Sequence, residues 1–247
     1  MKMVKWAMTH NVWLSTTFEV QCILGWGGCG VVLGATRRSN NEEVAIKIIY
    51  RQLSIACTPD GLPKEIGLHQ FLEHPNIVES IEHSSDDRAY YLVMERFGVR
   101  WNNHTGGASI TIPAIDPTLQ DVSNDLASVH NTVVHHPHRP THERRSQGVV
   151  HGDIKEENIL VGVEAETLKR VLKLCDFGYS RKGIPGSAPM QIYGTREFCP
   201  PELVDNMIKY MQRKKTKHGV VGYAQDVWAL GLVLMPRYFE KDADDRS

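Results

Sequence analysis

The chain has few cysteines, and their spacing does not suggest a structural role. Its 247 residues include 5 Cys, an odd number, at scattered positions and without a C-x-x-C pair. This pattern argues against a disulfide framework and against a structural zinc site. We therefore expect the protein to work in a reducing compartment.

An excess of charge and long hydrophobic runs are also missing. The 28 Lys and Arg residues balance 29 Asp and Glu residues, so bulk charge indicates neither a nucleic acid nor a membrane surface as a partner. No apolar run reaches membrane-spanning length, and polar residues interrupt the segment 1–14, which lacks the apolar core of a signal peptide. We expect a cytoplasmic protein, or a nuclear one if the basic run at 209–218 is a nuclear signal.

What the chain does contain is a strand-rich first part. With 41% hydrophobic residues, its length suits one large domain or two lobes that share a cleft. Apolar residues at helical spacing predict one helix over residues 64–72, and a second over residues 119–134 is followed by a polar, loop-like stretch at 135–145. Five segments predict strands, the first three in an antiparallel sheet: 18–25, 31–37, 44–49, 76–82 and 90–95.

A glycine cluster separates the first two predicted strands. Gly25, Gly27, Gly30 and Val32 form the pattern G-x-G-x-x-G-x-V, in which missing side chains let backbone N–H groups approach phosphate oxygens. A dinucleotide-binding loop would open a helix, whereas the residues that follow are strand-like. The pattern favours a strand–loop–strand flap over phosphates, and on this motif alone an ordinary hairpin turn stays open.

A lysine and a glutamate suited to binding phosphates follow this cluster. Lys47 ends the strand-like run Val-Ala-Ile-Lys, where it would meet the α- and β-phosphates, and Ala45 is small enough to leave room for an adenine. Glu65, on the predicted helix, is the expected ion-pair partner of Lys47. The alternative is a solvated surface lysine and glutamate.

The densest group of reactive side chains lies at residues 150–161, VHGDIKEENILV. Here Asp153 would accept or orient the proton of a substrate hydroxyl, Lys155 would steady a moving phosphoryl group, and Asn158 would hold a magnesium ion. Asp176, which opens the triplet Asp-Phe-Gly, supplies a carboxylate as the second Mg²⁺ ligand. Phosphoryl transfer needs mainly positioning and charge neutralisation, which these groups provide.

Two further segments complete a series of six motifs in one order. Residues 194–202, GTREFCPPE, and 226–231, DVWALG, together with the four motifs above, resemble the catalytic domain of eukaryotic-type Ser/Thr protein kinases over about residues 18–235. A narrower similarity links the chain to the PIM and PAS-domain kinase branch of the calmodulin-dependent kinase group.

The resemblance implies an α+β, two-lobed protein kinase-like fold with a β-rich small lobe and a mainly helical large lobe. One kinase domain would span residues 1–247, with residues 18–97 as the small lobe and hinge and 98–247 as an incomplete large lobe. Residues implied in ATP binding are Leu24, Gly25, Gly27, Gly30, Val32, Ala45, Lys47, Glu65, Met94, Glu95, Phe97 and Leu160. Those implied in the activation segment are Phe177, Gly178, Thr195 and Glu202.

The function implied is transfer of the γ-phosphoryl group of ATP to Ser or Thr hydroxyls of protein substrates, with Mg²⁺ as cofactor. Asp153 and Lys155 would be the catalytic residues, and Asn158 and Asp176 the metal ligands. Neither a nucleic acid nor a membrane is expected as a partner.

Several positions depart from the kinase pattern. Gly152 stands where an arginine commonly binds a phosphorylated activation loop, which predicts activity that does not require that phosphorylation. His69 and Ser80 place polar groups in a stack expected to be hydrophobic.

Insertions are expected at residues 131–147 and 203–225, and only 21 residues follow Asp226, so Glu202 lacks its expected arginine partner and a truncated large lobe is predicted. The alternative function is a catalytically inactive, truncated kinase-like module for ATP binding or protein interaction.

Overall fold

The chain divides into two units, each described by itself. In this computed structural model, the described residues are 2–27, 30–53, 58–100, 149–163, 170–182, 194–212 and 222–244. The first unit comprises Met1–Glu73 and Val78–Phe97, and the second His74–Ile77 and Gly98–Ser247. The helix predicted at 119–134, the loop predicted at 135–145 and the insertion predicted at 131–147 lie outside the described residues.

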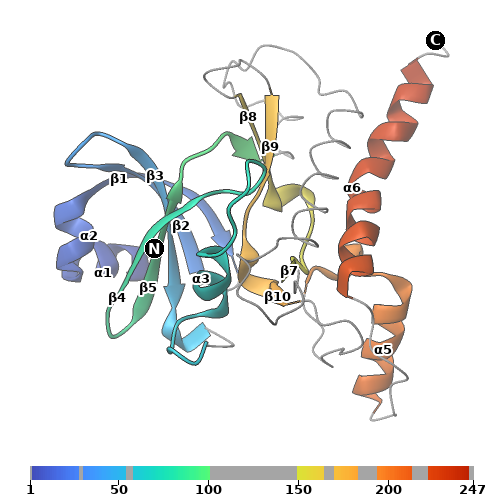
Figure 1. Ribbon diagram of the computed structural model, residues 1–247, viewed down its shortest axis with the longest axis horizontal. Helices are drawn as coiled ribbons and strands as arrows, with labels where there is room; N and C mark the ends of the chain where they lie inside the picture. The colour runs from blue at the N-terminus through green and yellow to red at the C-terminus, as the bar shows by residue number, and fades with distance from the viewer. Residues whose placement is uncertain are drawn as a thin grey trace, which may run out of the picture. The chain divides into compact units, whose positions relative to one another are not determined.

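An antiparallel five-stranded sheet forms the body of the first unit (Figure 1). Its spatial order is β1-β2-β3-β5-β4, so the last two strands are exchanged relative to the chain. The strands are β1 (Phe18–Gly27), β2 (Gly30–Arg37), β3 (Glu43–Tyr50), β4 (Ser80–Ser85) and β5 (Ala89–Glu95). The predicted strands at 18–25, 31–37, 44–49 and 90–95 are confirmed, each within two residues at either end.

The N-terminal residues form two helices that the sequence analysis did not predict. Helices α1 (Lys2–His10) and α2 (Val12–Thr17) lie beside the sheet in Figure 1. The side chain of Asn11 caps α2 by accepting a hydrogen bond from the Leu14 N–H at 2.7 Å. Ala7 and Leu14 join the alternating inward residues of β2, β3 and β5 in one buried core. Other members of that core are Phe18, Val31, Leu33, Ala35, Val44, Ile46, Ile48, Ala89, Tyr91 and Val93.

The helix predicted over 64–72 is shorter in the structure. Helix α3 spans Lys64–His69, because the backbone N–H groups of Phe71 and Leu72 bond three residues back, to Leu68 and His69. Such bonds tighten the last turn into a 3₁₀ geometry. Apolar spacing alone did not reveal this change.

The strand predicted at 76–82 is wrong in its first four residues. The Asn76 side chain donates to the Leu172 carbonyl at 2.8 Å, the Asn76 carbonyl accepts the Leu174 N–H at 2.8 Å, and Ile77 bridges Leu174. Residues 76–77 therefore belong to the second unit, and β4 begins at Ser80. Strand-like patterning of a short segment does not reveal such a change of pairing partner.

The second unit contains short strand pairs and two helices. Strands β6 (Val99–Arg100), β8 (Ile159–Val163) and β9 (Arg170–Leu174) form one antiparallel sheet, and β7 (Val149–Val150) pairs with β10 (Arg181–Lys182). Helices α5 (Pro201–Met211) and α6 (Gly222–Asp244) follow (Figure 1). Among the described residues, no helix has both the length and the apolar composition needed to cross a bilayer. The part of the insertion predicted at 203–225 that is described belongs mostly to these helices.

Asp86 fastens the N-terminal helices to the sheet. Its Oδ2 accepts hydrogen bonds from the Asn11 amide at 2.7 Å and the Tyr91 hydroxyl at 2.6 Å, and its Oδ1 accepts the backbone N–H groups of Arg88 and Ala89 at 2.9 Å. Burial alone would raise the pKa of Asp86, but these hydrogen bonds outweigh it and lower the pKa. The folded state therefore favours the charged carboxylate.

We predict that Asp86→Ala lowers the free energy of unfolding by about 1–3 kcal/mol, because the buried Tyr91 hydroxyl loses its acceptor. The lowered pKa contributes its full stability above the ordinary pKa of about 3.9 and loses it progressively as the pH falls further. The difference in unfolding free energy between Asp86→Ala and the unaltered protein should therefore narrow below pH 4. Urea unfolding between pH 3 and 7 measures both effects. Asp87→Ala, on an exposed neighbour, is the control, and an equal loss in both variants would contradict the assignment.

Candidate active site

Residues expected to bind ATP share one face of the five-stranded sheet. Across the strands, Val32 lies opposite Lys47, and Ala45 lies opposite Met94. Side chains alternate along a strand, so these four point to the face opposite the core that α1 and α2 cover. Leu24 joins them, because its side chain lies next to Gly34, the partner of Ala45. The sheet thus gathers five of the predicted ATP contacts.

Lys47 and Glu65 form a buried ion pair on the same face. Their Nζ and Oε1 atoms are 2.6 Å apart, and the two side chains are 7% and 4% exposed. Helix α3 is therefore held on the face of the sheet away from α1 and α2. The expected pairing occurs, and the solvated-surface alternative is wrong for both residues. Breaking one partner of such a pair would leave an uncompensated buried charge.

His69, one of the two polar residues in the stack expected to be hydrophobic, has a hydrogen-bond partner. Its ring is 2% exposed, and its Nε2 donates to the Val78 carbonyl at 2.6 Å. The end of α3 is thus tied to the chain that leads into β4. Ser80 is half-buried at the start of β4, opposite Met94.

The glycine-rich loop joins β1 and β2 as a strand–loop–strand hairpin, with Gly27 opposite Gly30. A dinucleotide-binding helix after the loop is thereby excluded. Gly30 has a packing role as well, because a Cβ there would overlap the Ile48 carbonyl oxygen of β3. A Cβ at Gly27 would meet nothing within 4 Å, so packing does not require glycine there. Gly25 lies on β1 opposite Val32.

The remaining predicted ATP residues, at the end of β5 and on β8, are half-buried. Glu95 ends β5 and accepts the Glu79 N–H through its side chain at 2.8 Å, and Phe97 is half-buried just beyond it. Leu160 lies on β8 of the second unit, between Arg100 and Lys173 in the sheet register.

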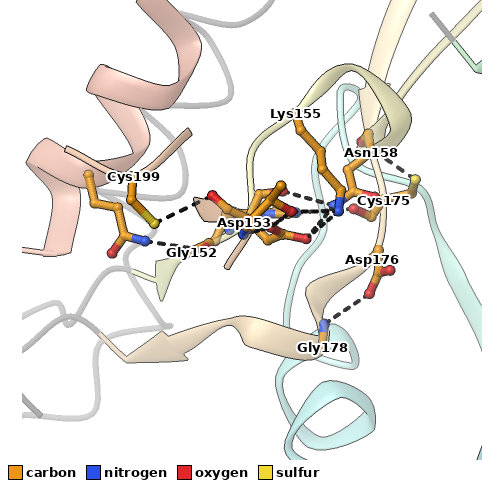
Figure 2. Close-up of polar contacts among 11 residues, drawn as sticks. Gly152, Asp153, Lys155, Asn158, Cys175, Asp176, Gly178 and Cys199 are labelled. Atoms are coloured by element: carbon orange, nitrogen blue, oxygen red, sulfur yellow. Dashed lines mark hydrogen bonds and ion pairs between the residues drawn. The ribbon is translucent and has the colours of Figure 1, made fainter. Parts of the chain in front are cut away.

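Asp153 is the centre of a hydrogen-bonded cluster in the second unit (Figure 2). Its carboxylate is buried, with 5% of the residue exposed. Thr195 donates to Oδ1 from its backbone N–H at 2.7 Å and from its hydroxyl at 2.8 Å. Lys155 and Asn158 approach Oδ2, each at 3.1 Å. Four donors thus fix the position of both carboxylate oxygens.

Lys155 connects the two sides of this cluster. Its Nζ donates to the Thr195 hydroxyl at 2.8 Å and pairs with Asp153. The neighbouring Cys199 thiol lies 3.4 Å from the Thr195 carbonyl, and burial, followed by the charge of Asp153, raises its pKa. The thiol therefore stays protonated near neutral pH.

The two expected metal ligands lie on adjoining strand ends. The Asn158 carbonyl accepts the Cys175 N–H at 3.0 Å, and Asp176 follows directly. Asn158 uses its Nδ2 to bond Asp153, which assigns the opposite end of its amide to the oxygen. Asp176 adopts a left-handed backbone, φ 64°, in which its carboxylate accepts the Gly178 N–H at 3.3 Å. An amide and a carboxylate oxygen suit a hard cation such as Mg²⁺.

A buried carboxylate on α6 holds the backbone before Asp153. Asp226 is 5% exposed, and it accepts the N–H groups of His151 and Gly152 at 2.7 and 2.9 Å. Burial raises the pKa of Asp226, while His151, these two bonds and Arg181 act in the opposite direction. The ring of His151 in turn donates to the Cys175 carbonyl at 3.1 Å and packs edge-on against Phe177.

Glu202 does not occupy a buried position. It is exposed in the first turn of α5, directly after Pro201. Its charge there favours the positive end of the helix, and proline suits the first helical position. An exposed carboxylate stays hydrated, so Glu202 does not need the arginine partner named above to offset a cost of burial.

Three polar residues around Gly152 were missed by the sequence analysis. Ser180 donates to the His151 carbonyl at 3.1 Å, Arg181 bonds Gln225, and Gln225 bonds the Gly152 carbonyl. Asp226, next to Gln225, belongs to a motif, but Ser180, Arg181 and Gln225 do not. No local sequence pattern therefore indicated a role for these three residues.

Comparison with known proteins now decides the family. Residues 18–242 match the protein kinase domain. The chain belongs to the protein kinase domain family. The predicted resemblance to eukaryotic Ser/Thr kinases and the predicted α+β kinase fold are both confirmed, and ATP is the phosphoryl donor that this family uses.

Relatives of this kinase domain include an Aurora kinase of Dictyostelium discoideum, 30% identical over 228 residues, which are 90% of this chain and 50% of the relative. An Aurora/IPL1-related protein kinase 2 of Caenorhabditis elegans is 28% identical over 87% of this chain and 61% of its own length. Serine/threonine-protein kinase Aurora-1 of Arabidopsis thaliana is 27% identical over 92% and 67%. The chain thus spans about half to two thirds of these relatives. The narrower PIM and PAS-domain similarity stays a prediction.

We predict that Gly152→Ala destabilises the kinase domain by about 1–3 kcal/mol. Gly152 has φ 80°, and an added Cβ would lie 2.9 Å from the Tyr179 carbonyl oxygen. Gly231→Ala is the matched control, because its Cβ meets nothing within 4 Å and alanine favours the α6 helix by roughly 0.5–1 kcal/mol. Denaturant unfolding compares the two, and a neutral Gly152→Ala would disprove the packing argument.

Proposed function

We propose that this kinase domain transfers the γ-phosphoryl group of ATP to Ser or Thr hydroxyls of protein substrates. The observation that carries the proposal is the buried Asp153 carboxylate, held by donors from Thr195, Lys155 and Asn158. A general base must be held rigidly before its substrate arrives, and this arrangement meets that requirement.

In the proposed reaction the substrate hydroxyl oxygen forms a bond to the γ-phosphorus as the bond to the β–γ bridging oxygen breaks. Asp153 accepts the hydroxyl proton, and ADP leaves with the electron pair of the broken bond. Lys155 moves from Asp153 and Thr195 toward the transferring phosphoryl oxygens, which frees an Oδ2 lone pair for the substrate. Asp153 stays in place during this change because Asn158 and Thr195 keep their bonds.

Residues of the first unit are proposed to bind ATP. In the first unit, Lys47, kept in position by Glu65, binds the α- and β-phosphates. The glycine hairpin covers the phosphates, and Leu24, Val32, Ala45 and Met94 offer an apolar sheet face for the adenine. The backbone of residues 95–97 bonds the adenine edge.

Asn158 and Asp176 would hold the magnesium ion through their oxygens. When bound, the ion neutralises charge on the phosphate oxygens. The residues fit this group because the amide nitrogen of Asn158 already bonds Asp153, and because the chain joins both ligands through Cys175. A cytoplasmic location for the protein remains our prediction.

Asp153→Asn should reduce phosphate transfer at least ~100-fold, because the amide cannot accept the proton. The measurement is transfer of radiolabelled phosphate from ATP to a generic basic protein in the presence of Mg²⁺. Asp87→Asn, at an exposed turn of the first unit, is the control and should match the unaltered protein. Equal, background-level signals from the unaltered protein and Asp153→Asn would refute the enzyme and favour the binding-module alternative.

The hydroxyl of Thr195 should matter as well, since it bonds both Asp153 and Lys155. We predict that Thr195→Val, which keeps the shape and removes the hydroxyl, lowers kcat about tenfold. Thr195→Ser retains the hydroxyl and should stay within about threefold of the unaltered protein. Steady-state kinetics with one peptide substrate test this pair, and similar kcat values for Val and Ser would count against the role.

A further inference from the structure

The space beside Gly152 is filled by an arginine from another strand. A Cβ built on Gly152 would lie 3.2 Å from Arg181 Nη1. Arg181 begins β10, which pairs with β7 so that Arg181 lies opposite Val150. Strand β10 thus brings a guanidinium next to Gly152, which has no side chain of its own, in the segment 151–155 that we call the catalytic loop.

Gln225 links that guanidinium to the catalytic loop. Arg181 Nη2 donates to Gln225 Oε1 at 2.9 Å, and Gln225 Nε2 donates to the Gly152 carbonyl at 3.2 Å. A guanidinium has only donors and a carbonyl only acceptors, so the amide orientation of Gln225 is determined by both partners. Gln225 is 3% exposed, which makes the loss of either bond costly.

Consecutive residues of α6 therefore hold both ends of Gly152. Gln225 bonds its carbonyl, and Asp226 bonds its amide N–H at 2.9 Å. The same carbonyl lies against Gly194, where φ is 111° and any Cβ would overlap the Gly152 oxygen. Gly194 precedes Thr195, which bonds Asp153. A shift of the Gly152 carbonyl would thus disturb the backbone before Asp153. It would also disturb Gly194, and with it Thr195, which bonds Asp153.

Arg181 also places a positive charge near the buried Asp226 carboxylate. Its charge lowers the pKa of Asp226, against the larger effect of burial. A charged Asp226 accepts both backbone N–H groups, so Arg181 supports the anchor of the loop by charge as well as through Gln225.

We propose that Arg181 and Gln225 are positioning residues that act as one unit to hold Gly152, and through it Asp153, in the geometry for phosphoryl transfer. Neither residue needs to contact the substrate. The inference rests on the proposed function, since the geometry it protects is that of the proposed base.

The first test measures kcat and the KM for ATP of Arg181→Met, Gln225→Leu and the double variant. We expect each single variant to lose on the order of tenfold in kcat, because the backbone at Gly152 shifts. The KM for ATP should stay within about twofold, because Lys47 and the apolar sheet face proposed to bind ATP belong to the first unit. Since both act through one hydrogen-bonded chain, the double variant should be no slower than the slower single variant. Independent, multiplying losses, or unchanged kcat values, would overturn the proposal.

More conservative variants test the same proposal if Arg181→Met or Gln225→Leu fails to fold. Gln225→Glu retains the acceptor for Arg181 but loses the donor to Gly152, so it should lose kcat like Gln225→Leu. Arg181→Lys should recover part of the activity lost in Arg181→Met. Arg38→Met, which removes an exposed arginine of the first unit, is the control for lost charge and should match the unaltered protein.

Hydrogen–deuterium exchange separates this proposal from the proposed function. Amides of residues 149–155, measured without ATP, should exchange faster in Arg181→Met and Gln225→Leu and at the unaltered rate in Arg38→Met. If the unaltered protein transfers no phosphate, the proposed function fails, while the exchange result still tests whether Arg181 and Gln225 hold Gly152. Unchanged exchange in both variants would overturn the proposed role of Arg181 and Gln225 even if the enzyme is active.

Discussion

The second unit depends on one buried carboxylate, that of Asp226. It gives α6 a direct hold on the backbone N–H groups of His151 and Gly152. A buried charge is costly unless it is fully hydrogen-bonded, and here the bonds come from the loop that carries Asp153. The hydrogen bonds that offset the cost of burying Asp226 therefore also position the proposed base, Asp153.

The first unit relies on a comparable arrangement around its sheet. The buried pair of Lys47 and Glu65 holds α3 on one face, and Asp86 binds the N-terminal helices near the other. In both units a charged group is stabilised by partners distant in the sequence. The scaffold and the reactive groups are thus held by the same kind of contact.

Much of this was predictable from the sequence, for identifiable reasons. Strand-like runs, one of them β-branched and two separated by a glycine cluster, predicted four of the five strands. Alternate residues of β2, β3 and β5 pack into the buried core. Motifs with fixed spacing, such as Asp153 with Lys155 and Asn158, predicted the cluster because neighbouring loop residues stay close after folding. The partnership of Lys47 with Glu65 followed from the family resemblance.

The remaining features depend on contacts that no local pattern records. Residues 76–77 join the second unit through bonds to Leu172 and Leu174, about a hundred residues on, so their strand-like composition misled the prediction. The bond between Arg181 and Gln225 joins residues that are far apart in the sequence and belong to different elements. Glu202 is exposed in the first turn of α5, which begins at Pro201. The motif at 194–202 did not predict that a helix begins there.

Asp153, Lys155 and Asn158 are proposed to carry out phosphoryl transfer from ATP to a hydroxyl. Phosphorus-31 NMR of the protein with ATP, Mg²⁺ and a basic peptide containing Ser or Thr tests it most directly, because every phosphorus product is observed at once. One phosphoserine or phosphothreonine should form for each ADP, with little free phosphate. Unchanged ATP, or ADP accompanied only by free phosphate, would contradict it.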